Sequence, residues 1–164
     1  MDISYLGHAS FKLSNKTGVV VLSDGKVDLT AGNHMLITGP GEYEIGGISV
    51  IGFRRKDDGL AFVVEMEGLR ICYLGDWEKV SDKEVDQIGD IDVLMALTKA
   101  SDAALAIEPK IIVPIYLGKA DADEFVKAVG VKAEKMDKLS LKLGSLPTGE
   151  QLVALLGEGK NGKS

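Results

Sequence analysis

The chain has 164 residues, of which 45% are hydrophobic and 27% are charged, and this is the composition of one globular domain rather than of a disordered chain. Its formal charge of −6 argues against nucleic acids and anionic membrane surfaces as partners, because binding to either needs clustered Lys and Arg. Aromatic residues contribute only 5%, so we expect a core of aliphatic side chains.

Short β-favouring runs separated by turn residues open the chain. They cover residues 3–6, 10–13, 18–22 and 27–29. Asp24-Gly25 lies between the last two runs, and an Asp-Gly pair supplies the positive φ angles of a type I′ hairpin turn. We therefore predict an antiparallel meander.

The same pattern continues to residue 74. A strand over 34–38 is expected to end at Gly39-Pro40-Gly41, because proline cannot donate to a β-ladder. The pairs Gly46-Gly47 and Glu67-Gly68 each separate two β-favouring runs and predict two hairpins, whose strands cover residues 42–45, 48–53, 60–66 and 69–74. The basic run Arg54-Arg55-Lys56 is followed by Asp57-Asp58 and is predicted to form a solvated turn.

The second half changes to the pattern of strand-helix-strand units. Ser81 and Glu84 form a capping box that predicts a helix start, and Gly89 stands at the expected helix end. Further helices are predicted over 101–107 and 121–129, strands buried on both faces over 91–97 and 111–115, and a closing strand over 151–156. We predict an α/β fold: a four-layer αββα sandwich of largely antiparallel or mixed sheets, with one domain over 1–156 and a flexible tail over 157–164.

The cysteine content indicates the compartment. Cys72 is the single cysteine and cannot form an internal disulfide, and no leader segment opens the chain, so we expect a reducing, cytoplasmic location. Cys72 lies in an apolar run and is expected to be a small buried hydrophobe rather than a nucleophile. No apolar run reaches the roughly 20 residues that a membrane-spanning helix needs.

Four segments share an order and spacing that is found in one known family. They are Leu6-Gly7-His8-Ala9-Ser10-Phe11, Gly39-Pro40-Gly41-Glu42-Tyr43-Glu44-Ile45, Ile71-Cys72-Tyr73-Leu74-Gly75-Asp76 and Ile111-Ile112-Val113-Pro114-Ile115-Tyr116. Together they resemble the metallo-β-lactamase superfamily, in its Zn-dependent hydrolase-like branch, over about residues 1–156. The resemblance implies a metal site at one end of the sandwich, built from a His-X-His-X-Asp-His loop, a further histidine, the aspartate after Gly75 and a histidine after the last buried strand.

The sequence departs from that ligand set. It holds two histidines, and only the aspartate carries over, as Asp76. Gly39-Pro40-Gly41-Glu42 stands where the histidine-rich loop is expected to begin, and Tyr116 lies near the place of the last histidine. We therefore predict a degenerate, truncated member without the family metal site and without a cofactor. The weak candidates for a metal are Asp76, which otherwise accepts hydrogen bonds within its own loop, and His8 and His34.

Five residues are candidates for binding: His8, Glu42, Tyr43, Glu44 and Tyr116. In a strand, Glu42 and Glu44 face one side of the sheet and Tyr43 faces the other. The two carboxylates act as acid and base if burial raises the pKa of one of them, or they form a solvent-facing surface. His8 either holds the first hairpin through a ring nitrogen or takes part in acid-base chemistry.

Three functions remain open from the sequence. The first is a non-catalytic binding or interaction module, with a homodimer as one form it could take. The second is a metal-dependent hydrolase of a phosphodiester, lactone or thioester, with zinc at a reduced site around Asp76. The third is an incomplete protomer that borrows ligands from a partner chain. The loss of the histidine-rich loop together with the last histidine favours the first.

Overall fold

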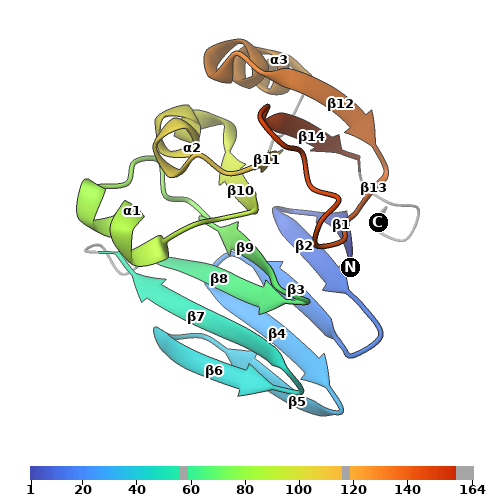
Figure 1. Ribbon diagram of the computed structural model, residues 1–164. Coiled ribbons are helices and arrows are strands. Elements are labelled where there is room, and N and C mark those ends of the chain that lie inside the picture. Colours follow the sequence, from blue (N-terminus) through green and yellow to red (C-terminus); the bar gives the residue numbers. More distant parts are fainter. Residues whose placement is uncertain (56–58, 116–118, 158–164) are drawn as a thin grey trace.

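Two β-sheets pack face to face, and the helices cover the outer face of one of them (Figure 1). The computed structural model describes residues 1–55, 59–115 and 119–157. Within these ranges an antiparallel six-stranded sheet has the order β13-β1-β2-β3-β4-β5. Its strands are β1 (Asp2–Gly7), β2 (Ser10–Ser14), β3 (Val19–Ser23), β4 (Lys26–Ala31), β5 (Asn33–Ile37) and β13 (Lys138–Ser140).

The second sheet is mixed and, in the described ranges, has eight strands in the order β12-β14-β11-β10-β9-β8-β7-β6. The pairs from β12 to β9 are parallel, and those from β9 to β6 are antiparallel. Its strands are β6 (Gly41–Ile45), β7 (Ile48–Arg54), β8 (Leu60–Met66), β9 (Leu69–Tyr73), β10 (Val93–Leu97), β11 (Ile111–Ile115), β12 (Lys132–Met136) and β14 (Leu152–Leu156).

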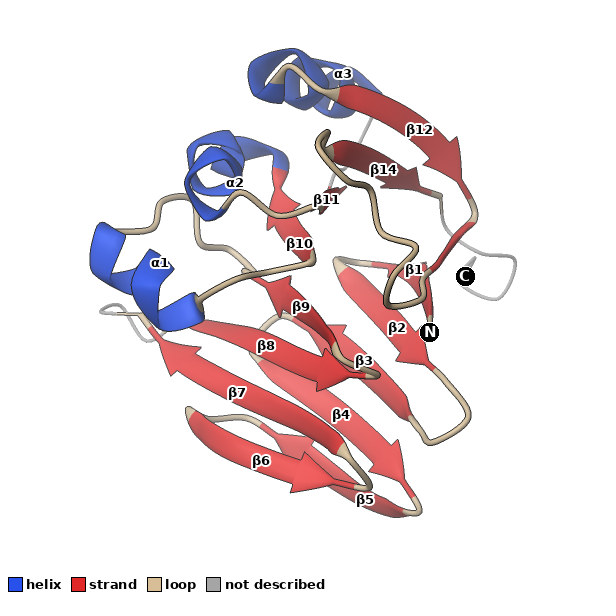
Figure 2. Cartoon of the chain, in the orientation of Figure 1, coloured by secondary structure: helices blue, strands red, loops and turns tan. Residues whose placement is uncertain are grey.

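The helices follow the parallel strands, as the sequence predicts (Figure 2). They are α1 (Asp82–Ile88), the 3₁₀ turn η1 (Thr98–Ala100), α2 (Ser101–Ile107) and α3 (Lys119–Val129). The capping box at the start of α1 is confirmed: the Ser81 hydroxyl accepts a hydrogen bond from the Glu84 N–H, and the Glu84 carboxylate accepts one from the Ser81 N–H. None of the described helices is long and apolar enough to cross a membrane.

Turn chemistry accounts for the hairpins. The central residues of the β6–β7 turn, Gly46 and Gly47, both have positive φ angles, and so do Glu67 and Gly68 between β8 and β9. The β3–β4 hairpin also forms, with Ser23 opposite Lys26. Its predicted type I′ geometry is wrong, however, because only Gly25 of the Asp24-Gly25 pair has a positive φ angle.

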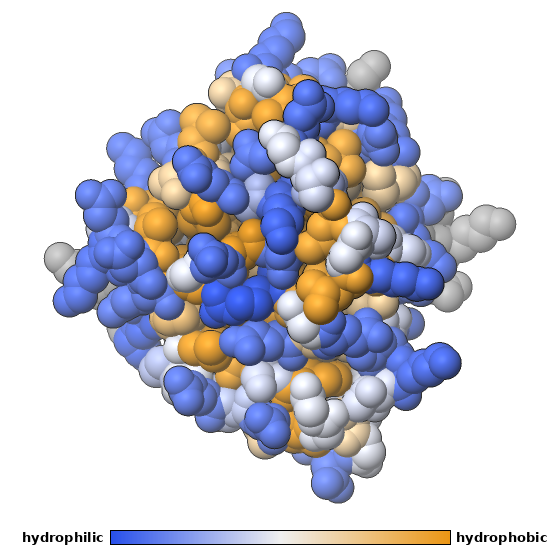
Figure 3. Space-filling view, in the orientation of Figure 1, coloured by the Kyte–Doolittle hydropathy of each residue, from blue (hydrophilic) through white to orange (hydrophobic). Residues whose placement is uncertain are grey.

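Two apolar clusters hold the layers together. The first lies between the sheets and contains residues such as Leu13, Phe62 and Val113, while the second lies between the eight-stranded sheet and the helices and includes Trp77 and Phe125. Strands β8 to β11 contribute to both clusters, which explains their continuous apolar sequences. On the molecular face in Figure 3, hydrophilic and apolar residues are interspersed.

The predicted α/β sandwich of two largely antiparallel or mixed sheets is confirmed, and its described helices pack on the eight-stranded sheet. No residue of a described helix belongs to the cluster between the sheets, and the described helices lie on the eight-stranded side. The outer face of the six-stranded sheet carries polar side chains in register, including Ser4, Lys12 and Asp28. Such a face is stable in water and does not need a second helical layer.

The sequence analysis did not predict two strands, β12 and β13, and both have polar sequences. β12 and β13 are the edge strands of their sheets, and their sequences, Lys-Ala-Glu-Lys-Met and Lys-Leu-Ser, lack an apolar run. An edge strand is exposed along one side, so few of its side chains need to be apolar. The predicted tail over 157–164 lies outside the described residues beyond Gly157.

Gly52 in β7 sets the path of the Gly39-Pro40-Gly41 segment. A Cβ at residue 52 would lie 2.7 Å from the Gly39 carbonyl oxygen and 3.2 Å from the Pro40 Cα. We predict that Gly52→Ala lowers the free energy of unfolding by about 1–3 kcal/mol, because backbone has to move. Urea unfolding measures this, with Gly39→Ala as the control, since a Cβ at residue 39 has only the Tyr43 hydroxyl within 4 Å, at 3.9 Å. Equal costs for the two variants would refute the close contact.

Candidate functional site

The candidate site is the edge of the sandwich where the β1–β2 turn, the β3–β4 turn and the end of β9 meet. Tyr73, the last residue of β9, donates a hydrogen bond of 2.6 Å from its hydroxyl to the carbonyl oxygen of Ala9 in the β1–β2 turn. A Cβ placed on Gly75 would lie 3.6 Å from Oδ1 of Asp24. The two sheets therefore bring Asp24 and the Gly75-Asp76 segment to the same edge, next to His8 and Ala9.

The β1–β2 turn holds two non-glycine residues in the left-handed region. His8 has a φ angle of 51° and Ala9 one of 59°, and they are the central residues between the paired Gly7 and Ser10. For L-residues this conformation costs about 1–2 kcal/mol each. Two tyrosine hydroxyls oppose that cost: Tyr5 Oη accepts a 3.2 Å hydrogen bond from the Ala9 N–H, and Tyr73 Oη donates to the Ala9 carbonyl.

Burial keeps the phenol of Tyr73 protonated, and its hydrogen bond to the Ala9 carbonyl requires that proton. The pKa of Tyr73 is raised well above the usual range, mainly by burial of the phenol and further by the negative charge of Asp24, by Tyr5 and by Asp76. The phenol therefore stays protonated and acts as a donor, which is the role it has toward Ala9.

Asp76 lies beside an arginine. Its side chain is 58% exposed, and its Oδ1 accepts a hydrogen bond of 3.2 Å from Nη2 of Arg55, whose side chain is only 20% exposed. The Arg55 guanidinium carbon lies 5.7 Å from the ring centroid of the buried Trp77. The prediction that Arg54-Arg55-Lys56 forms a solvated turn is therefore wrong for Arg55, because Trp77 and Asp76 hold its guanidinium against the sheet edge.

The two histidines do not join Asp76. His34 lies on β5, where its Nε2 is 2.7 Å from Oδ1 of Asp28, and both side chains are about half exposed. His8 is exposed at the tip of the strained turn, and its ring has no hydrogen-bond partner among the described residues. In the ranges that the structure describes, no three His, Cys, Asp or Glu residues come together in a group that could hold a metal ion.

Glu42, Tyr43 and Glu44 lie on β6, at the opposite edge of the eight-stranded sheet from β12. Glu42 and Glu44 are exposed, and Glu44 accepts a 3.3 Å hydrogen bond from the Ser49 hydroxyl. Tyr43 packs against the inter-sheet cluster, and its hydroxyl donates to the carbonyls of Gly39 and Pro40 at 3.2 and 3.0 Å. Tyr43 therefore fastens the turn before β6. Tyr116 lies outside the described residues.

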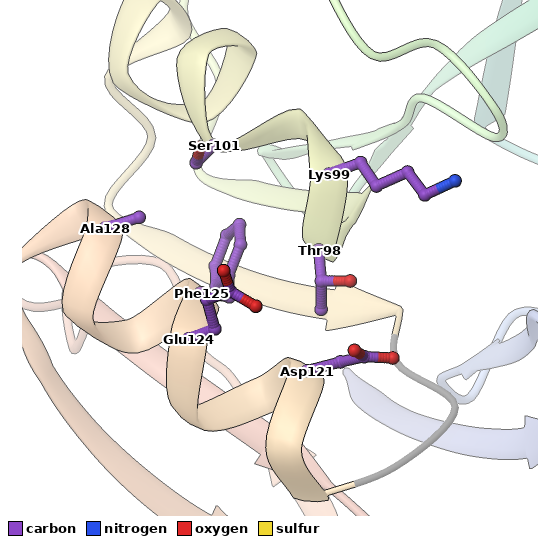
Figure 4. Close-up of a pocket in the computed structure, with 7 residues that line it drawn as sticks. All are labelled: Thr98, Lys99, Ser101, Asp121, Glu124, Phe125 and Ala128. Atoms are coloured by element: carbon purple, nitrogen blue, oxygen red, sulfur yellow. The ribbon is translucent and has the colours of Figure 1, made fainter.

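A polar recess that the sequence reading did not single out lies between η1, α2 and α3 (Figure 4). It measures about 400 Å³, and the hydroxyls of Thr98 and Ser101 and the carboxylates of Asp121 and Glu124 line it, with Phe125 among its walls. Figure 4 shows Lys99 extending away from it. Asp121 and Glu124 are three residues apart on one helix, and this spacing was the available signal.

Removal of the Tyr73 hydroxyl tests the clamp on the turn. We predict that Tyr73→Phe lowers the free energy of unfolding by about 1 kcal/mol at neutral pH, because the Ala9 carbonyl loses its donor. Above about pH 10 the unfolded wild type releases the phenol proton while the folded protein keeps it, so the wild-type stability falls with rising pH.

Tyr73→Phe lacks this proton and should show a shallower fall over the same pH range. Urea unfolding at a series of pH values measures both effects, and Tyr43→Phe controls for the loss of a tyrosine elsewhere. Parallel pH profiles of Tyr73→Phe and wild type would contradict the raised pKa. The raised pKa of Cys72, about 12 through burial, acts in both proteins and cancels in the comparison.

Substitution of His8 tests whether the turn is strained. We predict that His8→Gly raises the free energy of unfolding by about 0.5–1 kcal/mol, because glycine adopts a positive φ angle freely. His8→Ala keeps the left-handed strain and should remain close to wild type in thermal unfolding. The strain would be disproved if the glycine variant were no more stable than the alanine variant.

Comparison with known proteins identifies the family. A family model described as a beta-lactamase superfamily domain matches residues 22–129. The fold is similar to that of a Thermotoga maritima protein that is provisionally assigned as a Zn-dependent hydrolase of the metallo-beta-lactamase superfamily, with a TM-score of 0.77 and 24% identity over 96% of this chain and 100% of that chain.

A further structure, the metallo-beta-lactamase fold protein YhfI from Bacillus subtilis, gives a TM-score of 0.47 and 9% identity over 73% of this chain and 50% of that chain. No curated protein matches the sequence. The family match covers more than half of the chain, and the predicted resemblance is thereby confirmed. The chain belongs to the beta-lactamase superfamily and has the metallo-β-lactamase fold.

Proposed function

We propose that this protein is a non-catalytic binding or interaction module built on the metallo-β-lactamase fold. The observation that supports the proposal is the surroundings of Asp76, the strand-end carboxylate of the candidate site. Its described partner is a guanidinium, and no group of three His, Cys, Asp or Glu forms in the described ranges. A catalytic zinc ion takes about three protein ligands and keeps one open position.

The remaining potential ligands do not fit zinc either. His34 is paired with Asp28 on β5, while His8 sits on the β1–β2 turn. Cys72 is fully buried, and burial raises the pKa of its thiol to about 12, whereas zinc binds the thiolate. These residues therefore do not fit a catalytic zinc ion.

The features that remain are suited to recognition. The recess between η1, α2 and α3 offers two hydroxyls and two carboxylates beside Phe125, and these groups can form hydrogen bonds with a polar ligand. The lone buried thiol of Cys72 is consistent with a reducing compartment such as the cytoplasm.

Metal content and hydrolysis measured together test this function. We predict that full-length protein purified without chelators carries no stoichiometric zinc, manganese or iron. It should hydrolyse a nitrophenyl phosphodiester, a lactone and a thioester no faster than Asp76→Ala does, with or without added zinc. Glu78→Ala, which removes another exposed carboxylate two residues further along, is the matched control.

The opposite result would establish the hydrolase alternative. In that case the wild type and Glu78→Ala hold near-stoichiometric metal and hydrolyse one of the three substrates, and Asp76→Ala loses both properties. Light scattering on the same samples reports the oligomeric state. A monomer that holds no metal rules out a site shared between two protomers.

A further inference from the structure

We infer that the guanidinium of Arg55, which follows β7, takes the place of a metal ion as the positive partner of Asp76. The negative charge of Asp76 after the end of β9 is thus balanced within the protein. This inference deepens the proposed function and rests on it in one respect, the absence of a metal at Asp76.

The backbone places Arg55 at a defined position. Arg55 follows the last residue of β7, and its N–H donates a hydrogen bond of 2.8 Å to the carbonyl of Gly59, just before β8 begins. This backbone hydrogen bond fixes the position from which the Arg55 side chain extends. The side chain is only 20% exposed, which sets it apart from an ordinary surface arginine.

Gly59 provides the space in which the guanidinium lies. A Cβ at residue 59 would lie 2.5 Å from Nη2, 2.8 Å from Cζ and 2.9 Å from Nε of Arg55. The guanidinium thus packs directly over the glycine, and any larger residue there has to displace it. The same Nη2 atom is the donor to Asp76.

The end of β9 supplies the other two contacts from adjacent residues. Gly75 has a φ angle of 61°, and the turn that it starts is closed by a 3.2 Å hydrogen bond from the Trp77 N–H to the Leu74 carbonyl. Asp76 remains exposed after this turn while Trp77 is buried at 1% exposure. A planar guanidinium can lie near an aromatic ring and donate to a carboxylate at the same time, which an ammonium group cannot do as well.

This arrangement competes with a metal ion. Zinc bound to Oδ1 of Asp76 at about 2 Å would lie within roughly 5 Å of the guanidinium, where two cations repel each other. The carboxylate has its positive partner already. We therefore expect Asp76 to contribute to the stability of this edge through Arg55.

A double-mutant cycle tests the pair, because it isolates their interaction from every other contact that either residue makes. We predict that Arg55→Gln and Asp76→Asn each lower the Tm by about 1–4 °C and that the double variant loses less than the sum. Arg55→Lys should not restore the wild-type Tm. Gly59→Ala should lower the Tm of the wild type but have little further effect on Arg55→Gln.

Two control variants separate the effect of breaking the Arg55–Asp76 pair on Tm from the effect of a changed net charge. Lys12→Gln removes a positive charge on the outer face of the six-stranded sheet, and Glu78→Gln removes an exposed carboxylate near Asp76. Neither should change the Tm by more than about 1 °C.

A zinc titration that follows Tm completes the test and does not depend on the Arg55 variants. We expect zinc chloride to leave the wild-type Tm unchanged. Strictly additive Arg55 and Asp76 variants, or a zinc-induced rise in the wild-type Tm that Asp76→Asn abolishes, would overturn the inference. If the effects of the Arg55 and Asp76 variants on Tm are additive and the protein does not hydrolyse the three substrates, only the Arg55–Asp76 pairing is refuted. If the metal-free protein hydrolyses a substrate while the two variants remain non-additive, only the proposed function is refuted.

Discussion

Burial of the central strands on both faces is the constraint from which the rest of this structure follows. Strands β8 to β11 contribute side chains to the inter-sheet cluster and to the cluster under the helices. No charged side chain among the described residues is buried in this core, although Tyr73 brings a hydroxyl into it. The charged side chains of the described residues therefore lie at the ends of the strands and on the surface, as Asp76 does.

At those strand ends, hydrogen bonds hold a turn and a carboxylate in place. Tyr5 and Tyr73, one from each sheet, hold the strained His8-Ala9 turn through its backbone groups. Asp76 is held by Arg55, which in turn lies over Gly59 and near Trp77. Both arrangements use hydrogen bonds and packing where a metal centre would need several deprotonated ligands. The chain has the metallo-β-lactamase fold, and the described side chains at this edge are held by contacts within the protein.

Much of the fold follows from local sequence. The glycine pairs between β6 and β7, the capping box of Ser81 and Glu84, and the apolar runs of β10 and β11 each have a local cause, and each formed as predicted. The strand-helix-strand pattern of the second half predicted helices outside the sheets, and the described helices lie on the eight-stranded side, whereas the outer face of the six-stranded sheet carries polar side chains. The edge strand β12 was missed because exposure along one side removes its apolar pattern.

Only part of the candidate site could be predicted from the sequence. Asp76 could be found because it follows an apolar strand and a glycine, but its partner Arg55 lies 21 residues earlier in a run that has the composition of a solvated turn. Only the folded chain brings Gly59, Asp76 and Trp77 around that guanidinium. Long-range ion pairs of this kind leave no periodic signal, whereas hairpins and caps do.

The most direct test of this account is a crystal structure of the full-length protein grown with zinc, with diffraction data collected at the zinc absorption edge. The account predicts that Arg55 stays within hydrogen-bond distance of Asp76 and that the anomalous map has no peak at that carboxylate. An anomalous peak within bonding distance of Asp76, with the Arg55 guanidinium displaced, would contradict it.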